Sequence, residues 1–162
     1  MKLQPYLNKL EKSKEFKKFK QKQPEAYICA GFFILDFETK KNQHHLDYYL
    51  PNKKIMTFML DDKIQQKESE TVMKKTPEKL DINEKLDLDQ IHGIIQDEMK
   101  NRTVTEPIKK IIAILQTQEG KDIWNVTCLL GGLKLLKVHI DDSSKSIVRF
   151  EEASMMDFVK RV

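Results

Sequence analysis

Apolar and polar residues alternate most regularly between residues 122 and 150. From Trp124 to Leu130 every second residue is apolar, which is the period of a half-buried strand. The pair Gly131-Gly132 that follows can supply the positive φ of a tight turn. The pattern predicts an antiparallel three-strand meander with one face in a core, and its strands span Trp124 to Leu130, Leu136 to Ile140 and Ile147 to Phe150.

The first 24 residues predict two short helices. Apolar residues at helical spacing form one face and then a second, rotated face: Leu3, Leu7 and Leu10, followed by Phe16 and Phe19. The rotation predicts a kink or a new start near Ser13, whose hydroxyl can cap the next turn. Pro24 is expected to close the second helix.

Three strands are expected after these helices. Residues 26–37 are apolar on both faces, as in a central strand covered on both sides or a strand held against another segment. The turn pair Pro51-Asn52 separates two shorter runs. The predicted strands are Ala26 to Phe37, Leu46 to Leu50 and Lys54 to Leu60.

The stretch from Asp61 to Glu84 is mostly charged or polar and predicts a linker. A helix follows it, because apolar residues recur at helical spacing: Leu88, Ile91, Ile95 and Met99. A further helix is predicted from Thr105 to Gly120, since a capping hydroxyl, an acid and an early proline begin it. Its expected buried face is Ile108, Ile111, Ile112 and Leu115. Residues 153–162 are long enough for a short closing helix.

The two halves therefore look like copies of one helix-plus-three-strand unit. At an offset of 92 positions, Phe16 aligns with Ile108 and Lys53 aligns with Lys145. Duplication and chance similarity in a lysine-rich chain both remain open. The expected parts are a first unit at residues 1–60, a charged linker at 61–86, and a linking helix with the second unit and a short C-terminal helix at 87–162.

The second unit resembles the PepSY module of the cystatin-like proteins. The motifs that carry the resemblance are Ile123-Trp124-Asn125-Val126, Val138-His139-Ile140-Asp141 and Ile147-Val148, within residues 105–151. In the turn, Ser144-Lys145 replaces the usual Thr-Gly. The resemblance implies an α+β fold of two cystatin/PepSY-like units, each a helix packed on a three-stranded antiparallel meander. It also implies a binding or peptidase-regulating module rather than an enzyme.

Composition favours an intracellular protein. The two cysteines, Cys29 and Cys128, lie in apolar runs, which is typical of buried thiols and not of a disulfide framework. No run reaches the roughly 18 to 20 apolar residues that span a bilayer. The longest run, 26–35, is followed by acids and by no small-residue cleavage site. We therefore expect a cytoplasmic location and no membrane association.

Clusters of reactive side chains are sparse. His44-His45 with Asp47 is the densest metal-capable group, but neighbouring strand residues point to opposite faces. The acid pairs Asp61-Asp62 and Asp141-Asp142 each end a strand, where acids are common turn residues. No phosphate-binding glycine loop or nucleophile motif is present. We expect no catalytic residues, no metal and no cofactor.

The lysine-rich second helix is the candidate binding surface. Its basic residues bracket the two phenylalanines and are Lys14, Lys17, Lys18, Lys20 and Lys22. One reading is a solvated outer face, and the other is a patch for phosphates or an acidic partner. The function expected first is a non-enzymatic protein-binding or adaptor module, through a sheet edge or the groove between units. The alternative is an RNA- or ribosome-associated factor with non-specific phosphate contacts.

Overall fold

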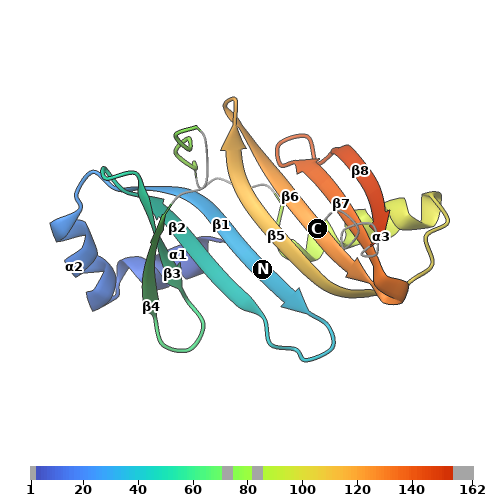
Figure 1. Ribbon diagram of the computed structural model, residues 1–162, viewed down its shortest axis with the longest axis horizontal. Coiled ribbons are helices and arrows are strands. Elements are labelled where there is room, and N and C mark those ends of the chain that lie inside the picture. The colour runs from blue at the N-terminus through green and yellow to red at the C-terminus, as the bar shows by residue number, and fades with distance from the viewer. Residues whose placement is uncertain (1–2, 71–74, 82–85, 155–162) are drawn as a thin grey trace.

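The computed structural model describes residues 3–70, 75–81 and 86–154, and these form one antiparallel sheet of eight strands with three helices (Figure 1). The strand order is β4-β3-β2-β1-β5-β6-β7-β8. The elements are α1 (Gln4–Glu11), α2 (Lys14–Lys22), β1 (Tyr27–Asp36), β2 (Gln43–Tyr49), β3 (Lys54–Met59), β4 (Gln65–Glu70), α3 (Leu88–Asn101), β5 (Ile108–Gln118), β6 (Lys121–Leu130), β7 (Lys134–Asp141) and β8 (Ile147–Ser154).

The two halves of the chain meet at the centre of this sheet. Strand β1 pairs antiparallel with β5, from Ala30 opposite Gln116 to Asp36 opposite Lys110. The prediction of two separate α+β units, each a helix on three strands, is therefore wrong. A shared ladder satisfies the backbone groups of both central strands, which two separate sheets would leave as unpaired edges.

The helix predicted from Thr105 to Gly120 is also wrong, because residues 108–118 form β5. Its burial alternates, with Ile111, Ala113 and Leu115 inside and Ile112 and Ile114 half-buried on the other face. β-branched isoleucines are stiff in helices and pack well in strands, and this preference outweighs the capping pattern. The predicted repeat at an offset of 92 positions is therefore wrong as well, because it aligns Phe16 of the helix α2 with Ile108 of the strand β5.

Two further expectations change in detail. The stretch expected as a charged linker contains the edge strand β4, in which all six side chains are exposed. Charged side chains on an edge strand discourage pairing with other chains. The expected C-terminal helix lies almost wholly outside the described residues, and its first residues, Ala153 and Ser154, end β8.

The other predicted elements are confirmed. The meander is β6 to β8, and at the Gly131-Gly132 turn Gly132 has a φ of 71°. Ser13 caps α2 by accepting a hydrogen bond from the Phe16 amide at 3.2 Å. Asp87 and Gln90 form a reciprocal capping box at the start of α3.

All three helices cover the same face of the sheet (Figure 1). Leucines of α1, phenylalanines of α2 and the apolar stripe of α3 join the inward residues of β1 to β3 and of β5 to β7 in one core. Phe16 and Phe19 pack against Tyr48 and Phe58, with ring centroids 5.1–5.7 Å apart. This covered face accounts for most of the buried apolar surface, and its burial is the main source of stability.

Candidate binding surfaces

The opposite face of the sheet carries no helix among the described residues, and we call it the uncovered face. Strand register places alternate residues of β1, β5 and β6 on it. Its centre is an apolar strip of half-buried side chains: Phe32, Ile34, Ile112 and Ile114. A second apolar group adjoins the strip at the start of β1 and consists of Tyr27, Cys29, Ala30, Tyr49 and Ile55. The four half-buried side chains of the strip leave part of their apolar surface to solvent, and adjoining apolar side chains of this kind can form an interaction site.

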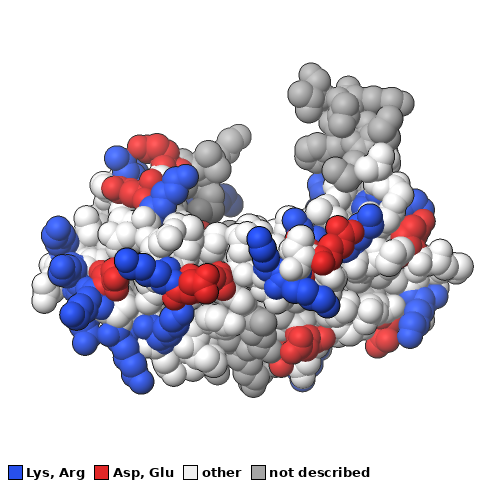
Figure 2. All heavy atoms as spheres, turned by 90° about the horizontal axis from the view of Figure 1, so that it is seen from below, with Lys and Arg blue, Asp and Glu red and all other residues white. Residues whose placement is uncertain are grey.

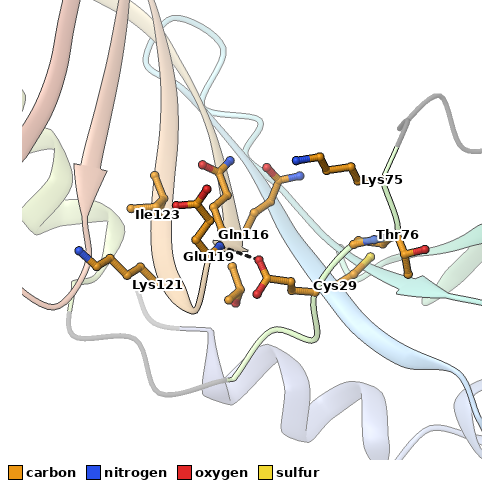
Figure 3. Close-up of a pocket in the computed structure, with 11 residues that line it drawn as sticks. Cys29, Lys75, Thr76, Gln116, Glu119, Lys121 and Ile123 are labelled. Atoms are coloured by element: carbon orange, nitrogen blue, oxygen red, sulfur yellow. Dashed lines mark hydrogen bonds between the residues drawn. The ribbon is translucent and has the colours of Figure 1, made fainter.

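A cavity of about 750 Å³, the upper pocket, opens at one end of this strip (Figure 3). Its floor includes Cys29 of β1, Gln116 of β5 and Ile123 of β6, and its far wall is the segment 75–78. The volume lies within the range of pockets that hold a small molecule or a few residues of a peptide.

Three hydrogen bonds hold the wall of the upper pocket in place. The Tyr27 hydroxyl donates to the carbonyl of Pro77 at 2.6 Å. The carboxylate of Glu78 accepts from the amides of Glu119 at 2.7 Å and Gly120 at 3.2 Å in the β5–β6 turn. The pocket is therefore preorganised, because the segment 75–78 is tied both to β1 and to the far hairpin.

The Cys29 thiol lines the upper pocket but is a poor nucleophile. Its side chain is 3% exposed, and burial raises its pKa to about 12. The thiolate is the reactive form of cysteine, so this thiol is unreactive at neutral pH. It contributes apolar surface to the pocket.

A smaller cavity of about 460 Å³, the lower pocket, lies at the other end of the strip. It is lined by Asp36, Lys110, Leu129 and residues of the β6–β7 turn, and the Lys110 ammonium lies 3.5 Å from the Asp36 carboxylate. Hydrogen bonds from the backbone amides of Thr39 and Glu38, together with the Lys110 ammonium, lower the pKa of the Asp36 carboxyl. The two pockets and the strip form one track along β1, β5 and β6.

Polar groups flank the strip on β2 and β3. The His45 ring stacks on Phe32 with centroids 5.4 Å apart, and burial lowers the pKa of this histidine. Burial raises the pKa of Asp47, although the Thr57 hydroxyl donates to its carboxylate at 2.6 Å. These groups border an apolar surface and do not converge on a common point, as groups in an active site would.

The histidine pair is split as strand geometry requires. His44 lies on the covered face, stacked on Tyr6 at 4.1 Å, and its Nδ1 is 2.8 Å from an oxygen of Asp61. His45 lies on the uncovered face opposite Phe32. Within the described residues, no group of three metal-capable side chains comes together.

The acid pair Asp141-Asp142 has a structural role. Asp142 is 1% exposed, and one of its oxygens accepts hydrogen bonds from the Trp124 indole at 2.9 Å and the Leu86 amide at 3.0 Å. Asp141 accepts from the amides of Ser143 and Ser144, which lowers its pKa. The first acid closes a turn, and the second fixes the residues before α3 to the meander.

The predicted lysines lie together on α2 at one end of the molecule, where Figure 2 shows basic residues gathered. Lys14, Lys17, Lys18 and Lys22 are exposed. Lys20 is partly buried, and its ammonium donates to the carbonyls of Ala26 at 2.9 Å and Pro24 at 3.3 Å. Four of the five predicted lysines therefore face solvent, whereas Lys20 binds the backbone that follows α2.

Sequence reasoning missed the track on the uncovered face. It assigned Ile108, Ile111, Ile112 and Leu115 to one helical face, whereas in β5 the two adjacent isoleucines point to opposite sides. The signal that was available is the density of isoleucine from 108 to 114, which is typical of a strand with two apolar faces.

Comparison with known proteins supports the fold. No family model and no curated protein matches the chain. The fold is similar to that of a solved structure described as a "putative lipoprotein" from Clostridium difficile 630, with a TM-score of 0.58 and 13% identity over 86% of this chain and 90% of that chain. At that identity the similarity shows the fold alone. The resemblance to PepSY and cystatin-like modules stays a prediction.

The single eight-stranded sheet corrects the expectation of repeated helix-strand modules. The lipoprotein description belongs to the neighbour, so the cytoplasmic location expected from the sequence gains no support from this comparison. In the part of the chain that the structure describes, none of the helices combines the length and apolar character needed to cross a bilayer.

Proposed function

We propose that this chain is a non-enzymatic binding protein that holds an extended segment of a partner protein on its uncovered face. The observation that carries the proposal is the track along β1, β5 and β6, in which an apolar strip joins two pockets. The sequence led to the same class of function but placed the contact at a sheet edge or between two units.

The length of the track favours an extended chain as the occupant. Cys29 borders the upper pocket and Asp36 the lower one, so seven residue steps of β1 separate them. At about 3.4 Å per residue, this is roughly 20–25 Å, the length of seven or eight residues of an extended peptide. A compact small molecule would fill one pocket and leave the strip in water.

The chemistry along the track favours apolar side chains in its middle. Phe32, Ile34, Ile112 and Ile114 offer no hydrogen-bonding groups there. At the ends, the amide of Gln116 and the ion pair of Lys110 with Asp36 supply polar groups. A peptide whose central residues are apolar and whose ends are polar would match this order.

Site-specific photo-crosslinking in host cells tests the proposal. The photoreactive residue p-benzoylphenylalanine replaces Phe32 on the strip or, as a matched control, Val148, which is 59% exposed on β8. We expect a discrete adduct of a second protein from position 32 and none from position 148. Adding Ile114→Glu should abolish the adduct, because a charge would be buried beneath the partner.

The outcomes separate the alternatives. Equal adducts at both positions, or no adduct at position 32, would contradict the proposal. A covalent adduct with a second copy of this chain would also contradict it, since the strip would then be a homodimer interface. Circular dichroism of each variant confirms that the sheet is intact.

A further inference from the structure

We propose that the exposed lysine face of α2, which comprises Lys14, Lys17, Lys18 and Lys22, is a second and separate binding site that takes the phosphate backbone of nucleic acid without reading its sequence. It lies on the helix-bearing side of the sheet, and it does not depend on the proposal for the uncovered face.

The four side chains are available for a ligand. All four are exposed, and none of the described residues forms a hydrogen bond or an ion pair with them. Two neighbouring lysines differ: Lys20 donates to backbone carbonyls, and Lys9 donates to the carbonyl of Leu60 at 2.8 Å. These two hold backbone segments together, whereas the four lysines of the α2 face extend into solvent.

A rigid helix holds the four ammonium groups on one side. Positions 14, 17, 18 and 22 follow the spacing of a single helical face, on which residues three or four apart have Cβ atoms about 5–6 Å from one another. The opposite side of α2 is fixed by Phe16 and Phe19, which pack into the core. The cations are therefore presented side by side on a fixed support.

Charge is distributed unevenly along the chain. Residues 1–24 contain eight lysines and two glutamates, an excess of six positive charges, whereas the whole chain has a net charge of +4. The remaining residues therefore carry a net charge of −2. This polarity would orient the α2 end toward a polyanion and turn the rest of the molecule away from it.

The chemistry of the face favours phosphates over bases. Phe16 and Phe19 are 9% and 5% exposed, so they cannot stack on bases. The first arginine of the chain is Arg102, so α2 has no guanidinium for bidentate base contacts. Lysine point charges on a phosphate backbone remain, and these give affinity without sequence preference.

A nucleic acid fits this face better than an anionic membrane. Stable attachment to a bilayer takes two signals, such as a basic patch together with an inserted apolar group. The apolar residues of α2 are buried, so this helix provides the basic signal alone. A phosphate backbone needs only the charges.

Fluorescence polarisation with a labelled oligouridylate of about 20 nucleotides tests the inference. For four phosphate contacts on a single strand, the slope of log K against log salt should be about −3, so affinity should fall about 50-fold between 50 and 200 mM salt. Oligouridylate and oligocytidylate should bind within about twofold of each other. The quadruple variant Lys14→Gln, Lys17→Gln, Lys18→Gln and Lys22→Gln should bind at least about tenfold more weakly at 50 mM salt, with a slope near zero.

A control variant removes the same number of positive charges from other parts of the surface. It carries Lys→Gln at four other exposed positions: Lys41, Lys63, Lys79 and Lys100. This control should keep the slope of the wild type. Equal loss in both variants would show an effect of net charge alone and would overturn the site. Unchanged binding in the α2 variant would overturn it as well, as would α2-dependent binding to phosphatidylserine vesicles without binding to the oligonucleotides. Equal urea midpoints confirm that both variants fold.

Discussion

Asp142 shows how one side chain can connect two parts of the fold. Its carboxylate accepts hydrogen bonds from a tryptophan on β6 and from the backbone just before α3, and it is buried. The sequence places this acid at a strand end, where acids usually sit in solvent. Only the return of residue 86 toward the meander, a long-range contact, turns it into an interior anchor.

Replacing Asp142 by Ala should destabilise the protein by about 2–5 kcal/mol, because the Trp124 indole and the Leu86 amide would lose their acceptor inside the core. Asp142→Asn keeps an acceptor oxygen and should cost clearly less. Urea unfolding followed by tryptophan fluorescence measures both. Equal losses for Ala and Asn would show that these two hydrogen bonds do not hold the anchor.

The two buried thiols should make the stability of the protein depend on pH. Burial raises the pKa of both Cys29 and Cys128 from 9.0 to about 12. A group whose pKa is higher in the folded state binds its proton more tightly there. Its contribution to stability is therefore complete below about pH 9 and decreases as the pH rises from about 9 toward 12.

We expect urea unfolding to show a larger loss of stability between pH 8 and pH 10.5 in the wild type than in the double variant Cys29→Ala, Cys128→Ala, by about 1–2 kcal/mol per thiol. The comparison with the double variant removes the effect of lysine and tyrosine titration. Parallel pH profiles would refute the burial of the thiols.

At the scale of elements, β5 marks the limit of what the sequence could predict. The meander, the helices α1, α2 and α3 and the strands β1 to β3 follow from local periodicity, and they were predicted close to their bounds. For residues 108–118, a helical start pattern and a strand-like run of isoleucines coexisted. Residues 108–118 form a strand because they pair with β1 on one side and with β6 on the other. No local sequence pattern encodes this pairing.

Two adjacent substitutions distinguish the strand from the predicted helix. In β5, Ile111 is 1% exposed in the core, whereas Ile112 lies half-buried on the uncovered face. Ile111→Lys should destabilise by more than about 3 kcal/mol, and Ile112→Lys by less than about 1 kcal/mol. On the predicted helix both residues would be inside, and the two losses would be similar. Urea midpoints decide between these outcomes.

The whole molecule is a sheet with two unlike faces. Three helices cover one face, and the other presents an apolar track between two pockets. The candidate site could not be predicted because its residues come from both halves of the chain, and their meeting depends on the β1–β5 ladder. The lysine face of α2 was predicted, since it is local to one helix, although its function remains a proposal.

Methyl NMR of isoleucine tests the uncovered face most directly. A dissolved gadolinium chelate broadens methyl signals that approach the solvent. We predict strong broadening for Ile34, Ile112, Ile114 and Ile123, and little for the core residues Ile91, Ile95, Ile111 and Ile140. Single Ile→Val variants assign the signals. Equal protection of the two sets would mean that both faces of the sheet are covered, and it would contradict a binding site on the uncovered face.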